Sequence, residues 1–258
     1  MEPDSAVVFV WAALAVAAFF AGVVDAVIGG GGMLQIPALF AFMPGVAPPP
    51  LLGTNKLASA IGTTGAAIQY ARSIDTPWRI VLPCVAVAFV AGIAGAYAVT
   101  LVPAEPLKKA IPFILAALLV YMWASRAGGE HSPRHSRAKS AAIATSGSGA
   151  IGFYDGFLGA GTGAFYKLLF VRGLGFSFLT AAAPAKFTNV ASNLGAVVAF
   201  AATGYIFWAL GLFMAVANFI GGQVGARIAL RYGNEFIRRA FYVIVTLLIA
   251  KTFVDAYF

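Results

Sequence analysis

The chain has 258 residues, of which 61% are hydrophobic and only 10% are charged, and its formal net charge is +8. Soluble domains carry about 25% charged residues because they need a hydrated surface, so this composition, with a mean hydropathy of +0.89, excludes a soluble globular domain. The basic residues lie in short loops between apolar runs, which indicates topology signals of a membrane protein and not a nucleic-acid surface. We therefore expect an all-α integral membrane protein.

Ten apolar segments follow one another along the chain. Those of the first half cover about 6–28, 33–43, 51–71, 79–101 and 107–124, and those of the second about 140–157, 161–171, 179–204, 208–229 and 237–257. A full crossing needs roughly 20 residues, and the second segment of each half is too short for one. The charged residues before the first segment are the acidic Glu2 and Asp4 alone. A cleaved signal peptide begins with basic residues, so we interpret this segment as a retained helix.

A hydrophilic stretch separates the two sets of segments. His131 and His135 lie in it, but Pro133 stands between them and disfavours the helix that would bring them together. We expect a flexible linker here, with no metal and no cofactor anywhere in the protein. The predicted organisation is a first transmembrane repeat over 1–124, a basic cytoplasmic linker over 125–139 and a second transmembrane repeat over 140–258.

One constellation of residues recurs, without a gap, 130 positions further along. Asp25 returns as Asp155 and Lys56 returns as Lys186. An ungapped repeat that carries charged residues inside an apolar chain is typical of a two-fold membrane transporter, in which both halves contribute to one site. The other recurring residues are Gly29 and Gly31 (Gly159 and Gly161), Trp78 (Trp208), and Gly92 and Gly95 (Gly222 and Gly225).

Each short segment follows a glycine cluster, over 29–32 in the first half and over 159–163 in the second. Glycine accepts backbone angles that other residues avoid, so a helix can break there. Broken backbone at membrane depth survives where it is buried in protein or lines a wet cavity. We interpret the two breaks as the binding site; the alternative is that the glycines serve tight helix packing alone.

The third segment of each half carries polar residues at positions i, i+3 and i+7, a spacing that places them on one helix face. A lysine opens each stripe, and a charged residue at the centre of a membrane helix costs roughly 2.5–3.5 kcal/mol, so it normally faces a cavity or a partner. Lysines with amide and hydroxyl neighbours, and backbone N–H groups at the breaks, predict a cradle for a small oxyanion. The predicted substrate-binding residues are Lys56, Ser59, Thr63, Lys186, Asn189, Asn193, Asn55, Gly31 and Gly161.

Asp25 and Asp155 stand just before the glycine breaks. As intramembrane carboxylates they are candidates for proton coupling, and holding the broken backbone is the alternative role. A different interpretation of the charges pairs Lys56 with Asp25 and Lys186 with Asp155 as structural ion pairs, or lets each lysine reach to a membrane interface.

Other polar residues support secondary predictions. Gln35 and Tyr166 could face the cavity, Asn218 could line the path or bond between helices, and Lys167 reads as an interface anchor. The small-residue spacings Ala91 to Gly95 and Gly221 to Gly225 predict close helix packing.

Loop charges place both chain ends outside if basic loops face the cytoplasm. Counting each short segment as a crossing gives five per half, an odd number that makes the repeats inverted. Were the short segments to re-enter without crossing, the number would be even and the repeats parallel. We expect inverted repeats, and the sequence leaves both arrangements open.

Four stretches, over 22–37, 53–63, 152–163 and 185–196, resemble the two repeats of the TauE/SafE sulfite exporter family. The resemblance implies a permease of a prokaryotic inner membrane that moves sulfite, sulfonates or related small organic anions, usually outward. On the matching positions it implies that Lys56, Lys186, Asn55, Asn189 and Asn193 contact the anion. Before Lys186 this chain has Ala183-Pro184-Ala185, where relatives often carry a polar residue, so the two half-sites are expected to be unequal.

The predicted function is secondary transport of a small anion by alternating access, with the lipid bilayer as surroundings and no enzymatic activity. The alternatives are a cation- or proton-coupled transporter that uses Asp25 and Asp155 as its ion site, and a non-transporting membrane scaffold. A monomer and a homodimer are both compatible with the sequence.

Overall fold

The computed structural model describes residues 3–124, 137–177 and 179–232, with four single positions beyond them at 246, 250, 253 and 254. This part of the chain is helical and contains no strand, which confirms the predicted all-α class. Linker residues 125–136 and most of the last predicted segment lie outside the described residues. The helices are α1 (Pro3–Val27), α2 (Gly31–Phe42), α3 (Pro48–Ala71), α4 (Trp78–Thr100), α5 (Ala104–Ala124), α6 (Arg137–Phe157), α7 (Thr162–Leu174), α8 (Ala182–Ala202) and α9 (Trp208–Tyr232).

Three helices in the described residues are long and apolar enough to cross a membrane, within Ser5–Val27, Trp78–Thr100 and Trp208–Arg231. They belong to α1, α4 and α9. Their outward faces carry exposed apolar side chains such as Val8, Val90 and Val216. A soluble protein would place polar residues there, so these faces suit contact with lipid.

The two helix breaks form where the glycine clusters predict them. α1 ends at Val27 and α6 at Phe157, and each end is followed by a glycine with positive φ, Gly29 at 90° and Gly159 at 85°. Side chains other than glycine rarely adopt this left-handed region. The chain therefore leaves the helix at each glycine and starts a short helix, α2 or α7, a few residues later.

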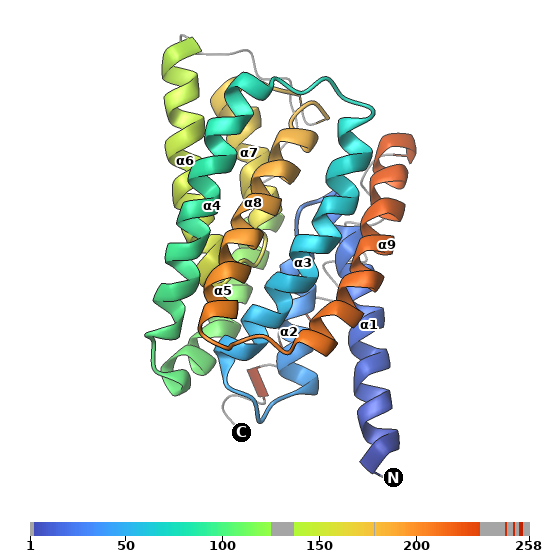
Figure 1. The fold of residues 1–258 in the computed structure, drawn as a ribbon. Coiled ribbons are helices and arrows are strands. Elements are labelled where there is room, and N and C mark those ends of the chain that lie inside the picture. The colour runs from blue at the N-terminus through green and yellow to red at the C-terminus, as the bar shows by residue number, and fades with distance from the viewer. Residues whose placement is uncertain are drawn as a thin grey trace.

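The short helices turn back and do not continue across the bundle. In Figure 1, α1 enters from the end where the N-terminus lies and stops inside the bundle, and α2 returns to that same end. α6 enters from the opposite end, and α7 returns there. Each pair of helices therefore makes a hairpin that begins and ends at the same end of the bundle, which favours re-entrant short segments over separate crossings. In the first half, α3 and α4 run the length of the bundle (Figure 1).

Helices of the two halves interleave. α9 of the second half packs against α1 and α3 of the first, while α4 of the first half packs against α6 and α8 of the second. Glycines allow these close approaches, since a Cβ atom at Gly221 would meet the carbonyl oxygen of Phe19 and one at Gly95 that of Phe153. The predicted small-residue packing is thus confirmed, and each hairpin is held by a helix of the other half.

Candidate functional site

The two helix breaks touch each other in the middle of the bundle. The N–H group of Ala164 on α7 donates to the carbonyl oxygen of Gly29 over 3.0 Å. A Cβ atom at Gly32 would lie 2.6 Å from the carbonyl oxygen of Gly159, closer than any side chain tolerates. The glycines therefore bring backbone against backbone, and α2 and α7 start side by side.

Two buried ion pairs cross between the halves at this point. Lys56 on α3 lies 2.7 Å from Oδ1 of Asp155 on α6, and Lys186 on α8 lies 2.6 Å from Oδ2 of Asp25 on α1. Both lysines are only 1% exposed, so neither reaches an interface. The interpretation that paired each lysine with the aspartate of its own half is wrong. Because the breaks stack on each other, each carboxylate faces the polar helix of the other half.

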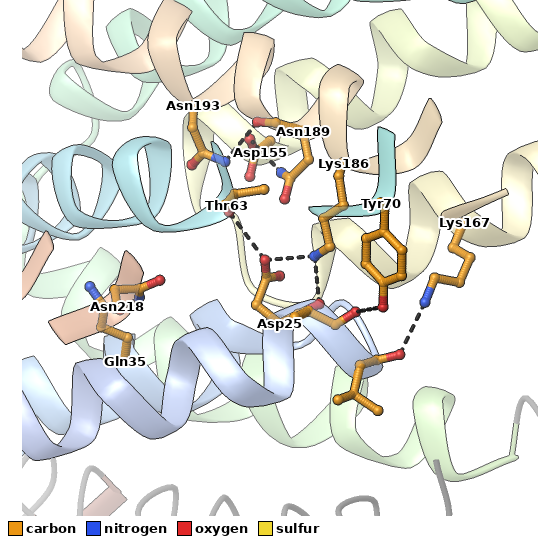
Figure 2. Close-up of polar contacts among 12 residues, drawn as sticks. Asp25, Gln35, Thr63, Tyr70, Asp155, Lys167, Lys186, Asn189, Asn193 and Asn218 are labelled. Atoms are coloured by element: carbon orange, nitrogen blue, oxygen red, sulfur yellow. Dashed lines mark hydrogen bonds and ion pairs between the residues drawn. The ribbon is translucent and has the colours of Figure 1, made fainter. Parts of the chain in front are cut away.

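The two aspartates differ in their surroundings. Asp155 is 1% exposed, and besides Lys56 it accepts hydrogen bonds from Ser192 at 2.5 Å and Asn189 at 3.4 Å. The Asp25 side chain is 13% exposed and accepts a bond from Thr63 at 3.1 Å (Figure 2). Asp155 is thus enclosed by donors, whereas Asp25 is the more accessible of the two.

A small polar cavity lies between the breaks. The volume open to the centre of a water molecule is about 10 Å³, enough for one water-sized species. Seven of the sequence-predicted site residues line it, and those are Asp25, Gly31, Ser59, Thr63, Asp155, Asn189 and Asn193. The remaining wall residues are Gly29, Gly32, Gly159, Thr162, Gly163 and Asn218.

Four predicted site residues do not line this cavity. Lys56 and Lys186 are bound to the two aspartates that line it. Asn55 is buried, and its Oδ1 atom has no hydrogen-bond partner among the described residues. Gly161 adopts a φ of 75° immediately before α7, so it shapes the break. The wall is therefore made of acidic, amide, hydroxyl and glycine residues, and the two ammonium groups are bound to its aspartates.

The carboxyl end of α1 is bound by three side chains in succession. Lys186 donates to the carbonyl oxygen of Asp25 at 2.5 Å, Tyr70 to that of Ala26 at 2.9 Å, and Lys167 to that of Val27 at 3.0 Å (Figure 2). The last carbonyl groups of a helix have no partner within it; that of Asp25 also accepts from the N–H of Gly29 at 2.8 Å. The prediction of Lys167 as an interface anchor is wrong, since its side chain is buried at this helix end. Tyr70 was missed, although it continues the face of Lys56 at i+14.

The structure also places the residues of the secondary predictions, Asn218, Gln35 and Tyr166. Asn218 of α9 lines the cavity and donates to Oε1 of Gln35 over 2.7 Å, so it has both of the roles considered for it. Gln35 is buried behind it, and Tyr166 donates to the carbonyl oxygen of Ser148 at 3.5 Å; neither lines the cavity. Thr162 was missed as a wall residue, and its position inside the second glycine cluster was the available signal.

Comparison with known proteins finds relatives that are named as membrane transporters. The chain is 37% identical over 242 residues to a protein of Sinorhizobium sp. named "Probable membrane transporter protein ORF9", covering 94% of this chain and 92% of that one. It is 35% identical over 240 residues to "Probable membrane transporter protein YfcA" of Escherichia coli strain K12, covering 93% and 88%. It is 32% identical over 238 residues to a "Probable membrane transporter protein" of Haemophilus influenzae, covering 92% of each.

No solved structure matches the chain. The family described as Sulfite exporter TauE/SafE matches residues 14–252, which is nearly the whole sequence and includes both breaks and both ion pairs. The protein belongs to the TauE/SafE family.

Proposed function

We propose that the protein is a secondary transporter that exports a small anion, such as sulfite, a sulfonate or a related organic anion, by alternating access. The family and the names of its relatives support a membrane transporter. The observation that carries the proposal further is the pair of crossed ion pairs at the cavity between the two breaks.

The buried lysines give the site its chemistry. An ammonium group inside a membrane protein needs an anionic neighbour, because its desolvation is costly. In this structure the neighbour is an aspartate of the other half. A substrate anion that enters the cavity can take the place of the carboxylate at the ammonium group. Substrate binding would then open an ion pair that joins the halves, which links occupancy of the site to their relative movement.

The small size of the cavity supports a closed state between the two access states. A volume of about 10 Å³ holds one water-sized species, so sulfite requires the walls to separate. The hairpins α1–α2 and α6–α7 enter from opposite ends (Figure 1). Movement of one hairpin would expose the site to one side, and movement of the other would expose it to the opposite side.

We further propose that the two repeats have inverted topology. The opposite entry of the hairpins supports this, and so do the equivalent residues Trp78 and Trp208, which begin α4 and α9 at opposite ends of the bundle (Figure 1). α5 has 21 residues, which is enough for a third traversal besides α3 and α4, and three is an odd number, as an inverted repeat requires. We also propose the repeat boundaries at 124 and 140, on either side of the hydrophilic linker 125–139.

Basic residues support an orientation in a prokaryotic inner membrane. They gather at the end where α3 stops and α6 begins, and by the positive-inside rule this end faces the cytoplasm. The N-terminus would then lie outside. The described residues at this end are Arg72, Arg79, Lys139, Arg172, Arg227 and Arg231.

One observation favours a second candidate function. The carboxylates line the cavity, whereas the lysines do not, and a cavity walled by oxygen atoms of Asp25, Asp155 and their neighbours also suits a small cation. A cation- or proton-coupled transporter would use these aspartates as its ion site, with the lysines as counter-charges.

Thermal stabilisation of the detergent-purified protein separates the candidates. We expect one anion among sulfite, thiosulfate, sulfoacetate and sulfate to raise the unfolding temperature at matched ionic strength. Stabilisation should amount to about 2.7 kcal/mol at 100-fold over Kd. The shift should vanish in Lys186→Met and persist in Arg72→Gln, which removes an exposed cation at the end of α3.

The other outcomes are equally defined. A shift with sodium or potassium ions that disappears in Asp25→Asn would favour the cation transporter. No shift with any salt, together with no flux of these anions in proteoliposomes, would favour the scaffold and rule out the proposal.

A further inference from the structure

We propose that Thr162, the first residue of α7, is a substrate contact that donates its hydroxyl hydrogen to an oxygen atom of the transported oxyanion. This inference rests on the proposed anion transport and names a binding residue for it. It is carried by a buried hydroxyl group at the point where two helix N-termini meet the cavity.

The Thr162 hydroxyl group is in an unusual state for a buried polar group. The residue is 2% exposed, and its Oγ1 atom has no hydrogen-bond partner among the described residues. It nevertheless lines the cavity between the breaks. Most buried hydroxyls in proteins are paired, and an unpaired one reduces stability. A ligand in the cavity would satisfy it.

The backbone around Thr162 favours an anion. Both α7, which is 13 residues long, and α2 begin at this cavity, and Gly31, Gly32 and Gly163 belong to its wall. The first N–H groups of a helix have no carbonyl partner within it, and together with the helix dipole they attract negative charge. The N–H of Ala164 is bound to Gly29, which leaves those of Thr162 and Gly163 as the donors of α7.

The surroundings of Asp25 show that the N-terminus of α7 lies next to a bound carboxylate. Its Oδ2 atom lies 2.6 Å from Nζ of Lys186, and its Oδ1 atom lies 3.1 Å from where a Cβ atom of Gly163 would stand. The carboxylate therefore sits between a lysine and the N-terminus of α7. A substrate oxyanion that displaces it would find the same lysine, the same helix end and, in addition, the Thr162 hydroxyl.

The hydroxyl group of Thr162 has no counterpart in the first repeat. The position equivalent to Thr162 in the first half is Gly32, which has no side chain to donate. Only the second break therefore offers a hydroxyl, and we infer a substrate whose oxyanion group is held at the α7 end, near Lys186 and Asp25. A compact sulfur oxyanion or a sulfonate has the oxygen acceptors for this arrangement.

The test is the affinity of purified variants for sulfite, thiosulfate and sulfoacetate, read as the shift in unfolding temperature against anion concentration. Thr162→Val keeps the shape of the side chain and removes the hydroxyl, and it should raise the apparent Kd of the stabilising anion roughly tenfold or more. Thr162→Ser keeps the hydroxyl and should stay within about threefold of the unchanged protein. Thr162→Ala is the second hydroxyl-free variant should valine disturb folding.

Ser148→Ala is the matched control. Its hydroxyl is also fully buried and without a hydrogen-bond partner among the described residues, but it does not line the cavity, so anion affinity should be unchanged. An anion shift in the unchanged protein that survives in Thr162→Val and Thr162→Ala overturns this inference and leaves anion transport standing. No anion shift in the unchanged protein overturns this inference, and together with no anion flux in proteoliposomes it overturns the proposed function itself. A shift with cations alone that depends on Thr162 overturns the donor role.

Discussion

The ammonium group of Lys56 on α3 lies 2.7 Å from the carboxylate of Asp155 on α6, and so joins two helices from different halves of the chain. The equivalent pair, Lys186 and Asp25, makes the reciprocal connection over 2.6 Å. Both pairs sit beside the point where the helix breaks touch. A movement of one half against the other must therefore act on both ion pairs, which makes them the part of the molecule best placed to couple ligand binding to that movement.

The crossed pairing predicts which charges are energetically coupled. A double-mutant cycle of Lys56→Met and Asp155→Asn should show a coupling free energy of about 0.5–3 kcal/mol, because the residues are in contact. The cycle of Lys56→Met and Asp25→Asn should be close to additive. Thermal unfolding of the purified variants measures both. Stronger coupling in the second cycle would mean that each lysine binds the aspartate of its own half.

The unequal surroundings of the aspartates predict unequal consequences of neutralising them. Asp155→Asn replaces a carboxylate that is bound by Lys56, Ser192 and Asn189. Removing one partner of a buried ion pair lowers the free energy of unfolding by about 3–5 kcal/mol. Asp25 is more exposed, so Asp25→Asn should lower the unfolding temperature less. We expect Asp25→Asn to impair anion flux in proteoliposomes nonetheless. Equal losses of stability in the two variants would contradict this division.

The second break predicts a steep sensitivity at Gly159. An alanine there would need a φ of +85°, and its Cβ atom would meet the ion pair of Lys56 and Asp155. Gly204 is the control, since its φ is +74° but a Cβ atom would meet nothing within 4 Å. Gly204→Ala should cost only the backbone strain, about 1–2 kcal/mol, and Gly159→Ala distinctly more. Unfolding temperatures that fall equally would show that the ion pair adjusts to the extra methyl group.

The proposed inverted topology predicts opposite labelling of two equivalent positions. Ala47 precedes α3 and Ser177 lies between α7 and α8, and they are related by the repeat spacing of 130 positions. Cys84 is the single cysteine of the sequence, so a Cys84→Ala background has no thiol that could react with a membrane-impermeant maleimide. In spheroplasts, Ala47→Cys should be labelled from outside, and Ser177→Cys only after the membrane is opened. Labelling of both from the same side would indicate parallel repeats.

Several features of the protein follow from its sequence alone. The apolar composition predicts membrane helices, because the surface of a soluble domain cannot be built from it. The glycine clusters predict the breaks, since only glycine adopts the positive φ found at Gly29 and Gly159. The repeat spacing and the i, i+3, i+7 stripes identify Asp25, Asp155 and most of the cavity wall. All of these signals are local or periodic, so they can be read without knowing how the helices pack.

The tertiary structure alone decided the partners. Whether Lys56 meets Asp25 or Asp155 depends on how the two hairpins stack, and the periodicity of one helix carries no information about that. The same holds for Lys167, which the close approach of α7 to the end of α1 draws to the carbonyl oxygen of Val27. It holds also for Thr162, which lines the cavity because α7 starts beside α2. Contacts between distant segments follow from close packing of whole helices, and this is why they appear only in the folded molecule.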